Sequence, residues 1–172
     1  MGEAAANSWS TEVVNGYLHI RGPIDERVIL EKIGLTPGTD VALNLKGVEA
    51  INSVGTGHWI RFWTDWTGEV EIHEASVPFM TAVTMMPAML APHKSLSMLK
   101  SFFMYYFCSQ CELEFEGLVR SDEIRIEDDE AFAPLKMCER CGGSATVDEE
   151  MISMMHIFVE NKEQIATAEG DL

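Results

Sequence analysis

Two CxxC pairs constrain this chain more than any other feature of its sequence. Cys108 and Cys111 form the first pair, Cys138 and Cys141 form the second, and these four are all the cysteines that the 172 residues contain. A CxxC segment places two sulfur atoms on one tight turn, so two such segments can supply the four thiolates of a tetrahedral metal site. The sequence therefore predicts that both pairs converge on one ion.

Four thiolates leave no coordination position for water, so we expect a structural ion, one Zn²⁺ per chain, in a zinc ribbon over residues 105–148. Segments 115–119 and 123–126 are the predicted strands of this ribbon. A rubredoxin-like iron site and a dithiol redox pair are the alternatives. Rubredoxin-like knuckles usually have glycine after both pairs, and here Glu112 follows the first pair, which favours zinc.

Charge and composition exclude several classes of partner. The chain has 28 Asp+Glu against 12 Lys+Arg, a formal net charge of −16, so we expect neither a nucleic-acid nor a membrane partner. Residues 1–10 lack the basic and apolar regions of a signal peptide, and no apolar stretch reaches the length of a membrane span. These features predict a cytoplasmic protein, and in that compartment paired cysteines more often hold metal than form disulfides.

The first half of the chain has the alternating pattern of an α/β domain with a mixed sheet. Asn15-Gly16 predicts a hairpin turn within residues 13–21, and Gly22-Pro23 is expected to end the second strand. The apolar periodicity of residues 24–33 predicts a short helix. The apolar run 41–45 predicts a central strand covered on both faces, followed by a loop over residues 46–52.

The strongest predicted helix follows that loop, with Asn52 or Ser53 as its N-cap. Its apolar stripe has helical spacing and consists of Trp59, Phe62, Trp63 and Trp66. We further expect a strand over 70–73, a helix over 78–86, and a strand over 96–107 that is the last of the sheet and leads into the first cysteine pair. A helix is the alternative for residues 96–107, because Met98, Phe102 and Tyr105 also have helical spacing, but the aromatic content favours the strand. A C-terminal helix over 149–166 is expected to pack on the ribbon, on the first domain or on a partner, with residues 167–172 fraying.

The segment VALNLKGVEAINSVGTGHWI, residues 41–60, resembles the signature of STAS domains. This family includes bacterial anti-sigma factor antagonists and the cytoplasmic domains of sulfate transporters. The resemblance covers residues 10–90 and implies a STAS-like domain over residues 10–104. Segments around both cysteine pairs, and the Met/Phe-rich segment after them, resemble a group of uncharacterised bacterial STAS-like proteins with a zinc ribbon, for which no reaction is implied.

The STAS resemblance implies that Ser53 is the phosphoacceptor of a partner kinase, with Asn52, Gly55 and Thr56 as candidate partner-binding residues. In this chain Asn52 stands where the family has an acid, and Asn44 where it often has another. A hydroxyl at a helix N-terminus lies where backbone N–H groups favour an added phosphate. The simpler interpretation of Ser53 is that it only caps the helix.

These features predict a non-enzymatic, zinc-stabilised interaction or signalling module of bacteria, regulated by phosphorylation at Ser53. A serine kinase or an anti-sigma-like regulator is the expected partner. The five histidines are scattered and predict no catalytic residues. One alternative function is a self-associating scaffold that forms homo-oligomers through a sheet edge or the Met-rich helix. The other is electron transfer by a tetrathiolate iron site.

Overall fold

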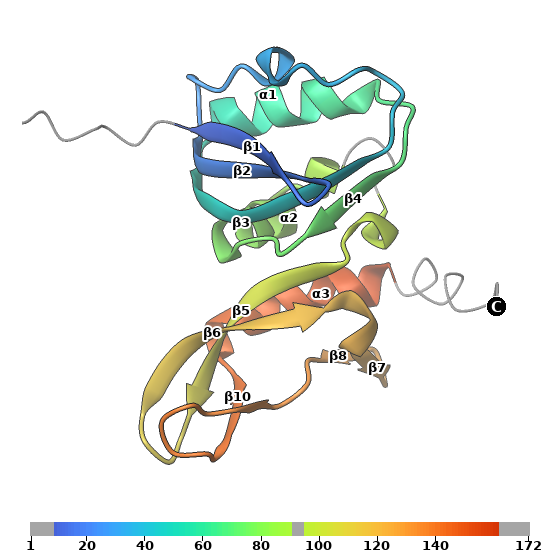
Figure 1. Ribbon diagram of the computed structural model, residues 1–172. Helices are drawn as coiled ribbons and strands as arrows, with labels where there is room; N and C mark the ends of the chain where they lie inside the picture. Colours follow the sequence, from blue (N-terminus) through green and yellow to red (C-terminus); the bar gives the residue numbers. More distant parts are fainter. Residues whose placement is uncertain (1–8, 91–94, 162–172) are drawn as a thin grey trace, which may run out of the picture.

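The computed structural model describes residues 9–90 and 95–161. Two four-stranded sheets lie one below the other in Figure 1, with helices packed on them, which confirms the α/β class. The first sheet has the order β1-β2-β3-β4, with strands Ser10–Val14, Tyr17–Ile24, Val41–Ile51 and Val70–His73. The second has the order β6-β5-β10-β9, with strands Leu113–Arg120, Ser101–Cys108, Ser144–Val147 and Lys136–Met137.

Shorter elements connect these strands. A two-stranded sheet pairs β7 with β8, and the three α-helices are α1, α2 and α3. Their bounds are Arg125–Glu127 for β7, Glu130–Phe132 for β8, Ser53–Thr64 for α1, Val77–Met85 for α2 and Ile152–Glu160 for α3. Short 3₁₀ helices span Leu30–Ile33, Pro87–Leu90, Leu96–Met98, Ser121–Glu123 and Glu149–Met151. None of the helices within the described ranges is long and apolar enough to cross a membrane.

The predicted hairpin turn is confirmed, because Asn15 and Gly16 both have positive φ, at 52° and 85°, as a type I′ turn requires. β1 and β2 are antiparallel, whereas β2 pairs with β3 and β3 with β4 in parallel, so the sheet is mixed. The prediction that β2 ends at Gly22-Pro23 is wrong. The pairing with β3 shifts register between these residues, so the strand tolerates the missing N–H of proline and continues to Ile24.

One prediction about β3 is wrong. The expected loop over residues 46–52 is mostly strand, because β3 runs to Ile51 by pairing with the second half of β2. The prediction that residues 41–45 form a central strand covered on both faces is confirmed, because four of the five are buried and Ala42 is half-buried. Helices α1 and α2 pack on the same face of the sheet, where the Trp59 ring of α1 lies 5.3 Å from the Phe79 ring of α2. On β2, Leu18 and Ile20 are buried beneath these helices, and Tyr17 and His19, which alternate with them, point to the other face and are half-buried.

The predicted helix over residues 24–33 is reduced to one 3₁₀ turn, Leu30–Ile33. The side chain of Asp25 explains the difference. Its Oδ1 accepts a hydrogen bond from the backbone N–H of Arg27 at 2.9 Å, and the Arg27 guanidinium pairs with the same carboxylate. Such local side-chain bonds compete with helical hydrogen bonding.

The predicted last strand, residues 96–107, is also different in the structure. Residues 96–98 form a 3₁₀ turn, and β5 begins at Ser101. β5 belongs to the second sheet, and its segment pairs with the first sheet's segment only at two isolated bridges. Ile72 of β4 pairs with Leu99, just before β5, and Ala75, just after β4, pairs with Phe102 of β5. β5 therefore crosses the predicted boundary between residues 104 and 105 and is shared by both halves of the molecule.

The C-terminal helix is confirmed in part. A 3₁₀ turn capped by Asp148 precedes α3, which packs on β8 and α2, and Phe158 stacks on Phe102 of β5 at 5.3 Å. Its methionines are buried in the chain's own core. The helix therefore joins the two halves, and the expected continuation to residue 166 and the tail 167–172 lie outside the described residues.

Candidate metal centre

Each cysteine pair lies at the tip of a β-hairpin. Cys108 is the last residue of β5, and Cys111 lies in the turn before β6. Cys138 follows β9, and Cys141 lies in the turn before β10. β10 pairs with β5, which sets the two hairpins side by side, and their tips meet at the end of the second sheet farthest from the first (Figure 1).

The four sulfur atoms gather in one small volume. The Sγ atoms of Cys108 and Cys141 are 3.5 Å apart, and so are those of Cys111 and Cys138. All four lie within 4.8 Å of one another, and none is in a disulfide. Four thiolates around one tetrahedral zinc ion at bonds of about 2.3 Å are separated by roughly 3.8 Å. The observed spacing fits such an ion, so the predicted convergence of the two pairs is confirmed.

Both turns use left-handed backbone after the second cysteine. Gly142 has φ 72° after Cys141, and Glu112 has φ 53° after Cys111. Glycine adopts this conformation freely, whereas glutamate pays a steric cost. The second turn is further closed by Gly142 N–H donating to Cys138 O at 2.8 Å and Gly143 N–H donating to Cys141 Sγ at 3.4 Å. The two turns therefore share one geometry despite their different residues.

The protein environment does not ionise the four thiols evenly. Backbone N–H groups of Cys141 and Arg140 lower the pKa of the Cys138 thiol to about 7. Burial, reinforced by the neighbouring thiols, raises the pKa of Cys111 to about 12. A cation held by these four sulfur atoms would supply the charge that keeps all four as thiolates, and its binding would displace protons from the cluster.

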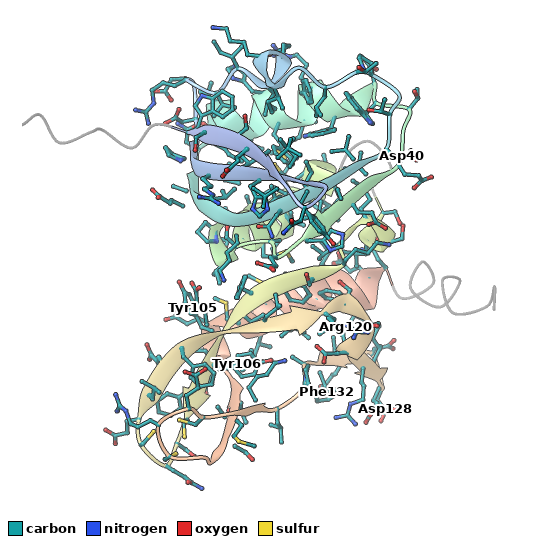
Figure 2. The ribbon with its side chains drawn as sticks, viewed as in Figure 1. Asp40, Tyr105, Tyr106, Arg120, Asp128 and Phe132 are labelled. Carbon is teal, nitrogen blue, oxygen red and sulfur yellow. The ribbon has the colours of Figure 1, made fainter. Side chains whose placement is uncertain are left out.

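Side chains next to the cluster fix the hairpins rather than adding ligands. Tyr106 of β5, labelled in Figure 2, donates from its hydroxyl to Pro134 O at 3.0 Å, which ties β5 to the segment before β9. Burial raises the pKa of Tyr106 to about 12, so the phenol stays neutral. Cys108 and Cys138 are buried, whereas Cys141 is exposed, so one side of the cluster meets solvent.

The residues named by the STAS resemblance lie together at the start of α1. Asn52 is the N-cap: its Oδ1 accepts from Gly55 N–H at 2.8 Å, and its Nδ2 donates to Glu26 Oε2 at 2.9 Å. Ser53 is the first helical residue and is exposed, so capping does not occupy its hydroxyl. Thr56 is 9% exposed, and Gly55 is buried.

A groove of 620 Å³ borders this helix start, between α1, α2 and the end of β3. Its walls include Asn52, Ser53 and Thr56. Met85 and Met86 line it from α2 and are 76% and 47% exposed. No sequence pattern distinguishes these two methionines, because only the packing shows which of the eleven methionines remain outside the core.

The fold and the cluster define the chain as an α/β protein whose four cysteines are positioned to hold a metal ion. Comparisons with known proteins add no narrower class: no family model matches the chain, no curated protein is significantly similar in sequence, and no solved structure is significantly similar. The STAS and zinc-ribbon assignments therefore remain predictions.

Proposed function

We propose that this protein is a non-enzymatic interaction module in which one Zn²⁺, held by Cys108, Cys111, Cys138 and Cys141, fixes the second sheet. The STAS-like first half is the part that meets the partner. The observation that carries the interaction role is the groove beside Ser53. It is apolar and lies open to solvent, and it adjoins an exposed hydroxyl at a helix N-terminus.

The partner in this proposal is a protein, either a serine kinase or an anti-sigma-like regulator. Exposed apolar side chains at one place favour a protein contact, and the exposed apolar side chains of this groove are Met85 and Met86. Phosphorylation of Ser53 would place about two negative charges on the groove wall, close to the carboxylates of Glu26 and Glu49. The helix N-terminus stabilises that phosphate, while the groove becomes less favourable for an apolar partner.

Site-specific photo-crosslinking in the native host tests the groove. A crosslinking amino acid at position 85 is expected to capture one defined protein, and the same amino acid at position 137 is not. Met137 is the matched control, because it is also 76% exposed but lies at the cysteine hairpins. Equal capture at both positions, or none at position 85, contradicts the proposal.

Ser53 is tested separately. Phosphopeptide mass spectrometry of the protein from its host is expected to find phosphate on Ser53, and Ser53→Asp is expected to reduce the crosslink at position 85 while Ser53→Ala keeps it. Absence of phosphate under all growth conditions removes the regulatory part of the proposal. The groove and its partner are unaffected by that result.

A further inference from the structure

The face of the first sheet that bears no α-helix is hollowed where it meets the second sheet. A cavity of 560 Å³ lies there, within the range of small-molecule sites in proteins. Tyr17 and His19 of β2, Asn44 of β3 and His73 of β4 supply the first sheet's wall. The opposite wall comes from the start of β5 and the end of β6, where Figure 2 labels Arg120.

The charge of the cavity wall is the reverse of the charge of the whole chain. Acidic residues outnumber Lys and Arg by 28 to 12 in the sequence. Among the lining residues, Lys100 and Arg120 are cationic, His19 and His73 are imidazoles, and Glu74 is the one carboxylate. The lining is therefore less acidic than the rest of the chain, which lowers the local repulsion of anions.

The cationic groups are held in place by carboxylates outside the cavity lining. Glu71 contacts the Lys100 ammonium at 3.4 Å and His73 Nε2 at 3.1 Å, and Asp122 pairs with the Arg120 guanidinium. The Lys100–Glu71 and Arg120–Asp122 pairs are exposed, and solvent screens both, although the Arg120 guanidinium contacts both carboxylate oxygens of Asp122. The His73–Glu71 contact is a hydrogen bond to a half-buried imidazole. An ammonium has three N–H donors and a guanidinium five, so both cations retain donors for a ligand.

The neutral part of the wall is rigid. The Tyr17 and His73 rings make an edge-to-face contact with centroids 4.9 Å apart. Ser101 is 8% exposed, and its Oγ accepts a hydrogen bond from Glu74 N–H at 2.9 Å. That bond holds Glu74 in a left-handed conformation, φ 49°, which is uncommon for glutamate and recurs at binding sites. Asn44 is 9% exposed, and its Oδ1 accepts from Lys46 N–H, which leaves its amide N–H₂ as a donor.

We propose that this cavity binds a small molecule through a carboxylate or phosphate group, contacted by Lys100, Arg120 and the two imidazoles. The site is independent of the groove at Ser53 and of the cysteine cluster, because none of its lining residues belongs to either. Its size suits a metabolite rather than a polymer.

NMR titration of the intact, metal-loaded protein tests the site with two probes, inorganic phosphate and acetate, at ionic strength held constant with sodium chloride. We expect saturable shifts of the His19 and His73 side-chain signals. His58 and His156 serve as internal controls, because they line other cavities. Tighter binding of phosphate assigns a phosphate-bearing ligand, and tighter binding of acetate assigns a carboxylate.

Substitutions test whether the anion binds in this cavity or is only attracted unspecifically to the charge of the protein. Lys100→Gln and Arg120→Gln are each expected to weaken probe binding about tenfold, the effect of losing one charge-assisted hydrogen bond. Arg61→Gln on α1 removes the same charge outside the cavity and is expected to change nothing. Non-saturable shifts, equal shifts at all four histidines, or equal affinities in the three variants would overturn the proposal.

Discussion

Glu112 occupies a backbone position that suits glycine. Its φ of 53° places a side chain in the left-handed region, at a cost of about 1 kcal/mol. Glu112→Gly is therefore expected to raise the free energy of unfolding by about 0.5–1 kcal/mol, measured by urea denaturation at a fixed free zinc concentration. Glu114→Gly is the control: it changes an exposed residue of β6, where glycine is expected to lower stability by a similar amount. A loss of stability in both variants would show that the backbone at Glu112 is not strained.

Two glycines of α1 are expected to respond to alanine in opposite ways. A Cβ on Gly55 would lie 2.0 Å from Ile24 O of β2, whereas a Cβ on Gly57 would have no neighbour within 4 Å. Gly55→Ala is expected to destabilise the protein by about 2–3 kcal/mol, because backbone must shift to admit the methyl group. Gly57→Ala is expected to stabilise it by about 0.5–1 kcal/mol through helix propensity. Thermal unfolding measures both changes, and similar effects of the two substitutions would show that α1 does not pack closely on β2.

Local sequence patterns predicted the residue-scale features well. Asn15-Gly16 predicted its turn, and Asn52 is one of the two caps expected for α1. Turns and helix caps depend on a few neighbouring residues, so the local sequence is sufficient to predict them. The strain at Glu112 was not predictable, because the requirement for a left-handed residue comes from the hairpin geometry rather than from glutamate itself.

The strand pairing that joins the two cysteine hairpins is short. β5 and β10 pair through only two residue pairs, Thr146↔Phe107 and Val147↔Tyr106, and β9 is a two-residue strand. Small β units with so few pairs need a metal or disulfide to stay folded.

Metal removal is therefore expected to act locally first. After chelation, hydrogen exchange of backbone amides in residues 136–144 is expected to rise by at least about tenfold. Exchange in β3 is expected to stay unchanged, because its buried core on α1 and α2 does not depend on the cluster. Mass-detected hydrogen exchange of metal-loaded and chelated protein makes the comparison. Unchanged exchange at both places would show that no metal supports the hairpins.

Elements were predictable where pattern and local bonding agree, and not elsewhere. Helices α1 and α2 and strand β4 follow their apolar periodicity. The helix expected over residues 24–33 fails because Asp25 bonds to the backbone of Arg27, which periodicity does not register. The extension of β3 to Ile51 depends on partners in β2, so tertiary pairing overrides the polar composition of residues 46–50.

The whole molecule depends on β5 and α3, which join its two halves. Phe158 of α3 is fully buried and stacks on Phe102, so Phe158→Ala is expected to cost about 3–5 kcal/mol. Ile152→Ala on the same helix is the control: its side chain is 55% exposed, and a change within about 0.5 kcal/mol is expected. Calorimetry of both variants measures the difference, and equal effects would show that α3 does not join the halves.

The arrangement of the whole molecule was the feature least predictable from the sequence. The convergence of Cys108 and Cys111 with Cys138 and Cys141 was predictable, because paired sulfur ligands at this spacing have few other roles. Three features were not predictable: the assignment of β5 to the second sheet, the face of the first sheet that bears no α-helix, and the cavity where the two sheets meet. They arise from the packing of segments far apart in the chain.

Elemental analysis of the purified protein, together with its visible absorption spectrum, tests the central claim most directly. We predict one zinc per chain and a colourless protein, with the metal lost in Cys108→Ser and in Cys138→Ser, one variant for each hairpin. Ser109→Ala changes a neighbouring residue between the sulfur ligands and is expected to keep the metal. A coloured protein with one iron per chain would replace zinc by a rubredoxin-like site, and wild-type protein that binds no metal at all would contradict the account of the four cysteines.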